Sequence, residues 1–195
     1  MSHLRLALVS LGLVAALAGC APAPAAVVSF DPAAPCPAEG QQPGAYPDLE
    51  AILPTDHEGR PPDSLDSGRM CTPAQLGTLA AAGIDEVRYA GTTWETGGTS
   101  GLTVAVFTGE GLDAPTMLEF YAAPARSARR TEELLTSETT VGGTSAHRLD
   151  VLGSDGSGQS IVTWQPADDG PVWVLLAADI GDTKVAEVLE TLGSR

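Results

Sequence analysis

The run that most constrains the fold is Val172-Trp173-Val174-Leu175-Leu176-Ala177, which is apolar at every position. A strand with one face in water alternates apolar and polar side chains, whereas a strand buried on both faces does not. We therefore predict a strand over 172–178 at the centre of a sheet that is covered on both sides.

The segments before this run predict further strands joined by glycine-rich and aspartate-rich turns. Three strands separated by such turns are predicted in the last third of the chain, over 145–152, 159–165 and 172–178. Their turns are predicted at 142–143, 153–158 and 168–170. The segment 134–141 also reads as a strand, with a helix as far as Leu135 as the alternative. Upstream, 84–95 and 102–108 predict a hairpin whose turn contains Gly97, Gly98 and Gly101.

Three helices have recognisable start and stop signals. Thr72-Pro73-Ala74-Gln75 has a capping threonine, a proline at the first helical position and a glutamine three residues after the cap. A second helix is predicted from Asp113, with Pro124 kinking or ending it. A third is predicted from a capping Asp182 to Gly193. The predicted fold class is α+β, a mostly antiparallel sheet of about five to six strands packed by about three helices.

The N-terminus has the pattern of an export signal. Arg5 precedes the uncharged apolar run 6–17, and small residues then lead to a cysteine in Leu17-Ala18-Gly19-Cys20. This segment resembles the lipobox signal peptide of bacterial lipoproteins. The resemblance implies export, diacylglycerol addition to the Cys20 thiol and cleavage after Gly19. A transmembrane anchor is the alternative, but a span needs about 20 apolar residues.

This reading divides the chain into three parts. Residues 1–19 are the predicted signal peptide, and residues 20–35 are the lipidated cysteine and an Ala/Pro-rich tether. Residues 36–195 form a single predicted α+β domain with an irregular N-terminal segment. Within that segment, 46–53 is predicted to be a short apolar turn that docks on the core, and 55–69 a surface loop.

The charge balance limits the partners. The chain has 10 basic and 25 acidic residues, so its net charge of −15 disfavours nucleic acid and anionic lipid surfaces. The lipid on Cys20 is therefore the expected membrane contact, at the extracytoplasmic face of the cell membrane. The expected partners are the lipoprotein-processing enzymes and an envelope protein or small ligand that the sequence does not identify.

Once Cys20 carries lipid, Cys36 and Cys71 are the remaining cysteines. In an exported chain such a pair predicts a disulfide. Two free thiols and half of a metal site are the alternatives.

Few residues have the pattern of a catalytic or metal site. His147 shares strand parity with Leu149 and Val151, which favours the core margin over a catalytic dyad. His57 lies between Asp56 and Glu58, where a solvated loop is favoured over a metal site. The basic cluster 126–130 is expected to pair internally with the glutamates that follow it.

The three tryptophans, Trp94, Trp164 and Trp173, are the best candidates for ligand or partner contacts. Core packing is the favoured alternative for them, with Trp164 and Trp173 facing each other across a hairpin.

The sequence thus predicts a lipid-anchored, non-enzymatic binding or interaction module of the cell envelope, with no cofactor and no metal. Two alternatives stay open. One is an envelope hydrolase that uses an unrecognised carboxylate or histidine site, and the other is a purely structural envelope lipoprotein.

Overall fold

The computed structural model describes residues 44–194, and the predicted signal peptide, tether and Cys36 lie outside this range. Seven strands form one sheet in the order β1-β2-β3-β7-β6-β5-β4, and every neighbouring pair is antiparallel. The strands are β1 (Ser64–Met70), β2 (Val87–Gly97), β3 (Ser100–Thr108), β4 (Thr131–Val141), β5 (Thr144–Gly153), β6 (Gly158–Trp164) and β7 (Val172–Ala178). The α+β class is confirmed, while the predicted strand count was too low.

Strand β7 lies in the middle of this sheet, between β3 and β6. Its neighbouring side chains Val174 and Leu175 point to opposite faces and are both fully buried. The central, doubly covered strand predicted from the apolar run is confirmed.

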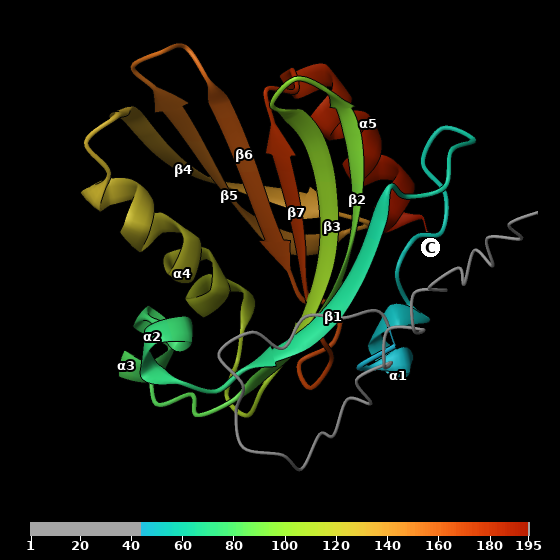
Figure 1. The fold of residues 1–195 in the computed structure, drawn as a ribbon, viewed down its shortest axis with the longest axis vertical. Helices are drawn as coiled ribbons and strands as arrows, with labels where there is room; N and C mark the ends of the chain where they lie inside the picture. Colours follow the sequence, from blue (N-terminus) through green and yellow to red (C-terminus); the bar gives the residue numbers. More distant parts are fainter. Residues whose placement is uncertain (1–43, 195) are drawn as a thin grey trace, which may run out of the picture.

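Helices cover both faces of the sheet (Figure 1). One face, called here the α4 face, is packed by α2 (Pro73–Leu76), α3 (Thr78–Ala81) and α4 (Ala114–Ser127). The other, called here the α5 face, is packed by α1 (Pro47–Glu50) and α5 (Asp182–Gly193). The predicted docking of 46–53 is confirmed, because Tyr46, Leu49 and Leu53 are buried there.

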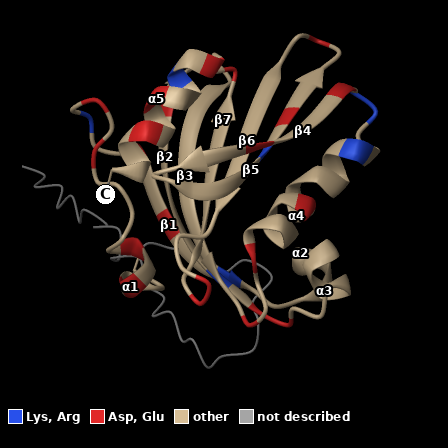
Figure 2. Cartoon of the chain, turned by 180° about the vertical axis from the view of Figure 1, so that it is seen from behind, with Lys and Arg blue, Asp and Glu red and all other residues tan. Residues whose placement is uncertain are grey.

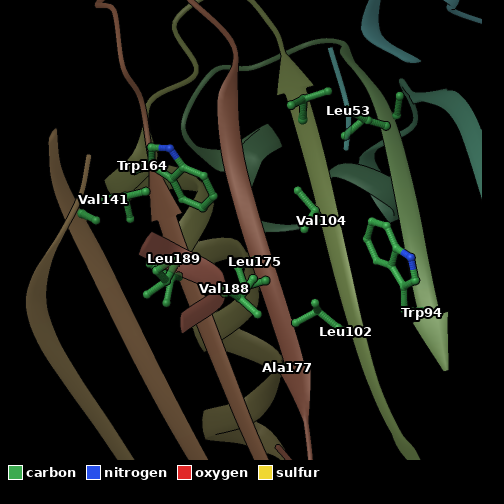
Figure 3. Close-up of a cluster of buried hydrophobic side chains, with 14 of the residues drawn as sticks. Leu53, Trp94, Leu102, Val104, Val141, Trp164, Leu175, Ala177, Val188 and Leu189 are labelled. Carbon is green, nitrogen blue, oxygen red and sulfur yellow. The ribbon is translucent and has the colours of Figure 1, made fainter. Parts of the chain in front are cut away.

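Each face has its own apolar layer. On the α4 face, Met117 of α4 packs with Leu149 and Val174 of the sheet. On the α5 face, Val188 and Leu189 lie over Leu175, while Trp94 and Trp164 lie farther out on either side of them (Figure 3). The sheet therefore separates two cores, and α5 closes the second one.

The prediction of a surface loop over 55–69 was wrong for its last part, because β1 begins at Ser64 and pairs with β2. The buried residues of this strand include Ser67 and Arg69, so its covered face is mostly polar, with Leu65 as the apolar residue on it. The Ser67 hydroxyl accepts a hydrogen bond from the Tyr46 amide at 2.9 Å. A strand whose inward face is mostly polar has no apolar alternation, and this explains why the sequence pattern missed it.

The helix boundaries differ from the predictions in three places. The capping box at Thr72 and Gln75 is confirmed, but the helix that it opens is interrupted at Gly77, where φ is +52°. Helix α4 continues through Pro124 to Ser127. Gly181 is the N-cap of α5, and Asp182 is its first helical residue. The Asp182 carboxylate accepts a hydrogen bond from Arg148 instead of capping the helix.

The β4–β5 hairpin turns through Gly142 and Gly143, both with positive φ, as the sequence predicts. The end of α5 packs directly on this turn. A Cβ placed on Gly193 would lie 2.2 Å from the Gly142 nitrogen, so this approach of two backbones needs glycine. Within residues 44–194, no helix is both long and apolar enough to cross a membrane.

Candidate binding hollow beside helix α5

A hollow of about 570 Å³ lies on the α5 face, where β4, β5 and β6 extend beyond the start of α5. We call it the α5-side hollow. Its lining comes from the three strands, the β5–β6 turn and the loop before α5, and comprises Glu133, Leu135, Asp150, Val151, Leu152, Gly156, Gly158, Gln159, Ser160, Asp179, Ile180, Gly181 and Asp182.

A network of polar side chains centred on Arg148 lies beside this hollow. Its guanidinium donates to both oxygens of Asp150 at 2.8–3.0 Å and to Asp182 at 2.5 Å. Ser160, which is buried, donates to Asp150 at 2.6 Å and accepts from Arg148 at 3.2 Å. The hydrogen bonds from Arg148 to Asp150 and then to Asp182 outweigh desolvation and raise the pKa of Arg148. The network fixes the start of α5 against β5 and β6.

Two leucines give the hollow an exposed apolar patch. Leu135 of β4 is 56% exposed, and Leu152 of β5 is 39% exposed. They lie on neighbouring strands, since Leu135 pairs with Asp150 and Glu133 pairs with Leu152. Large apolar side chains that remain in water beside fixed polar groups are typical of a contact surface.

The rim of the hollow is acidic. Glu133, Asp150, Asp179 and Asp182 line it, and Arg148 is the cation that contacts two of them. Figure 2 shows acidic positions spread along the strands, helices and loops, while the fewer basic positions lie at the end of α4 and at scattered places such as α5. The hollow therefore favours a cationic group over an anionic one.

Asp179 holds the rim in place with an unusual backbone conformation, φ +50°. One carboxylate oxygen accepts from the Gly158 amide at 2.7 Å and the other from the Thr99 hydroxyl at 2.9 Å. The Gly158 hydrogen bond, followed by that of Thr99, lowers the pKa of Asp179. One side chain thus joins the β2–β3 turn, the start of β6 and the loop before α5.

A second hollow, of about 730 Å³, lies at the opposite end of the sheet, between the loops before β2 and after β3. Its one cation, Arg88, donates to Glu86 at 2.8 Å and lies over the Tyr46 ring. None of its lining residues is a large apolar side chain. The α5-side hollow combines apolar and charged groups and is the better candidate for a binding site.

No family model, curated protein or solved structure matches this chain.

His147 lies at the core margin, as predicted, with its side chain 26% exposed. It projects from the α4 face of β5, opposite Glu138 of β4, and its Nδ1 is 2.9 Å from the Glu138 carboxylate. Arg148 and Asp150 project from the other face of the same strand, so His147 does not reach the α5-side hollow.

Two of the three tryptophans pack inside the protein, and Trp173 is half-buried. Trp94 and Trp164 are 1% and 4% exposed, and neither presents a surface to a partner in this conformation. Trp164 stacks on Trp173 with ring centroids 5.8 Å apart, so the predicted contact across the hairpin is confirmed. The Trp94 indole donates to the Arg60 carbonyl at 3.1 Å and makes an edge contact with His57.

The remaining predicted residues lie apart from the hollow. Cys71 follows β1, and its amide donates to the Gln75 side chain at 3.2 Å. Its proposed disulfide partner, Cys36, lies outside the described residues, so the bridge stays a prediction. Among residues 44–194, no group of three or more His, Cys, Asp or Glu side chains is placed to hold a metal ion.

The sequence pattern indicated only part of this site. It placed Arg148 and Asp150 two residues apart on one strand, and hence on one face. It missed Leu135 and Ser160, because their proximity depends on the pairing of β4 and β6 with β5. The basic cluster likewise pairs differently from the prediction, since Arg126 binds Glu119 within α4.

Proposed function

We propose that this chain is a lipid-anchored binding module on the extracytoplasmic face of the cell membrane, and that the α5-side hollow is its binding surface. The single observation that carries the binding role is the pair of exposed leucines beside the Arg148 network. The lipobox-like sequence at Cys20 supports the location.

The chemistry of the hollow supports recognition. Both oxygens of Asp150 accept hydrogen bonds from Arg148, and the Ser160 hydroxyl already donates to Asp150. These groups are held in fixed positions by one another, which suits complementarity to a partner. The leucines add apolar area that a partner would remove from water.

A hydrolase is the second candidate, because the carboxylate of Glu138 orients the ring of His147 at 2.9 Å. A histidine and carboxylate pair is one part of a general-base arrangement. A panel of esterase, peptidase, glycosidase and phosphatase substrates tests this candidate. Turnover by the full-length protein that His147→Gln removes, with the circular dichroism unchanged, would favour the hydrolase.

The binding proposal is tested by photo-crosslinking in the native host. A photoreactive amino acid is placed at Leu135 or Leu152, and at Ile52 as a control, because Ile52 is 42% exposed and lies outside the hollow. We expect adducts of one defined mass from positions 135 and 152 and none from position 52. Equal labelling at all three positions, or none at any, would contradict the proposed surface.

The location is tested in the same cells. The full-length protein is expected in the detergent-soluble membrane fraction, and Cys20→Ser is expected to abolish lipidation and processing. A Cys20→Ser protein that is still cleaved after Gly19 and still partitions into detergent would contradict the lipid anchor.

A further inference from the structure

The outer edge of β4 is a long strand edge beside the α5-side hollow. β4 is the last strand in the sheet order, and within the part of the chain described no strand pairs with its other side. Its 11 residues, Thr131–Val141, are mostly exposed and rich in threonine and glutamate. Along such an edge, alternate residues direct their N–H and C=O groups outward, ready to pair with another extended chain.

This edge and the hollow form one continuous surface. Glu133 and Leu135 belong to β4 and also line the hollow. A strand added to β4 would lie about 4.8 Å away, with every second side chain on the α5 face. Its side chains there would lie beside Leu135, and a long basic side chain would reach toward Asp150, about 10 Å away on β5.

The charges select among possible occupants. Glu133, Asp150, Asp179 and Asp182 line the hollow, and among residues 44–194 Arg148 is the cation that pairs with two of them, Asp150 and Asp182. The hydrogen bonds from the Ser157 hydroxyl and amide lower the pKa of Asp155, and Arg130, just before β4, adds a smaller effect in the same direction. The surface is therefore acidic with an apolar centre, and complementary to a chain that carries lysine or arginine next to an apolar residue.

A second copy of the chain fits this edge poorly. The antiparallel register that places Leu135 opposite its own counterpart also places Glu132 opposite Glu138, and like charges directly opposite one another destabilise a sheet. The net charge of −15 adds to this repulsion.

We propose that an extended basic peptide segment of a partner protein binds here by adding a strand to β4 and placing basic and apolar side chains into the α5-side hollow. This inference rests on the proposed function and specifies its partner: main-chain hydrogen bonds to β4 provide affinity, and the hollow selects the side chains.

The test measures fluorescence polarisation with the purified full-length chain in mild detergent. The probe is a labelled peptide, Lys-Thr-Leu-Thr-Lys-Thr-Leu, which as a strand presents its lysines and leucines on one face. The matched control peptide has glutamate in place of each lysine. We expect the lysine peptide to bind at least about tenfold more tightly and its affinity to fall as salt is raised.

Two neighbouring proline variants test strand addition. Of Thr136→Pro and Ser137→Pro, one removes an N–H that points outward and the other an N–H that pairs with β5, because the direction alternates along the strand. We expect the outward variant to keep its melting temperature and lose at least about tenfold in peptide affinity. The variant that loses the hydrogen bond to β5 is expected to have a lower melting temperature, and this shows which of the two variants it is.

A pair of charge variants tests the hollow. Glu133→Gln, at its rim, is expected to weaken the lysine peptide about two- to fivefold. Glu110→Gln, an exposed residue of the other hollow, is the control and is expected to leave the affinity unchanged. Equal effects of the two variants would overturn the assignment of the basic side chains to the α5-side hollow.

Three further outcomes would overturn the inference. They are no binding of the lysine peptide, equal binding of the two peptides, and peptide binding that the outward proline variant leaves intact. If crosslinks at Leu135 and Leu152 still form in cells, each of these results rejects the basic-strand partner while the proposed binding surface stands. If the crosslinks also fail, the proposed function falls with it.

Discussion

The two edge strands of the sheet, β1 and β4, differ in how their side chains are covered. On β1, α1 and the residues Ala45 and Tyr46 before it cover one face, and Ser67 and Arg69 are buried. On β4, seven of the 11 residues from Thr131 to Val141 are exposed, three are half-buried and only Val141 is buried. The difference lies in the surroundings of the strands, because both pair with one antiparallel neighbour in the same sheet.

Polar side chains serve opposite purposes at the two edges. At β1, Ser67 accepts from the Tyr46 amide and donates to Glu50 at 2.5 Å, so its hydroxyl attaches α1 to the sheet. At β4, Glu132, Glu133 and Glu138 remain exposed to solvent. Exposed charges on an edge oppose pairing with identical chains, and they leave the edge open to a partner of opposite charge.

The largest expected effect comes from uncovering β1. Leu49 is buried under α1, and Leu49→Ala should lower the free energy of unfolding by about 2–3 kcal/mol, near the low end for buried leucines because α1 lies at the periphery. Leu135→Ala on β4 is the matched control, expected within about 0.5 kcal/mol of the wild type. Urea unfolding followed by circular dichroism measures both. If the two variants lost similar amounts of unfolding free energy, the burial of side chains at β1 would stabilise the fold no more than the exposed side chains of β4 do.

A smaller effect is expected from the polar attachment itself. Ser67→Ala leaves the Tyr46 amide and the Glu50 carboxylate without this hydroxyl, and should cost about 1–2 kcal/mol of unfolding free energy. Ser137→Ala, at an exposed position of β4, is the control and should change stability by less than about 0.5 kcal/mol. A Ser67→Ala protein as stable as the wild type would show that α1 is held by its apolar contacts alone.

The contrast between the edges also explains which elements the sequence could predict. β7 is apolar at every position, and both of its faces are buried, so local composition was sufficient to place it. β1 hides polar side chains, and no local pattern distinguishes Ser67 in a buried strand from a serine in a loop. The covering of β1 depends on α1, which is a tertiary contact.

The same limit applies to the hollow. Arg148 and Asp150 are close in sequence and were recognisable as a pair. Asp182, however, is 34 residues from Arg148, and the sequence pattern assigned it to capping α5. Leu135 read as part of a strand or of a helix, and its exposure follows from the position of β4 at the end of the sheet. A single sequence does not display register or strand order. These determine which side chains Asp182 meets and how exposed Leu135 is.

The smallest expected effect is a pH dependence at the open end of the sheet. Because the hydrogen bonds from Gly158 and then Thr99 lower the folded-state pKa of Asp179, its ionised form favours the folded protein. That contribution is fully present above the ordinary pKa of 3.8 and is lost as the pH falls through the lower folded-state value. Asp179→Asn removes this titration, and asparagine tolerates the positive φ of the position. We expect the wild type to melt at a higher temperature than Asp179→Asn at neutral pH, and the two melting temperatures to converge as the pH falls below about 4.

Melting curves recorded from neutral to acid pH at constant ionic strength measure the difference. A gap that stays constant over this range would mean that the carboxylate of Asp179 does not help to hold the rim of the hollow.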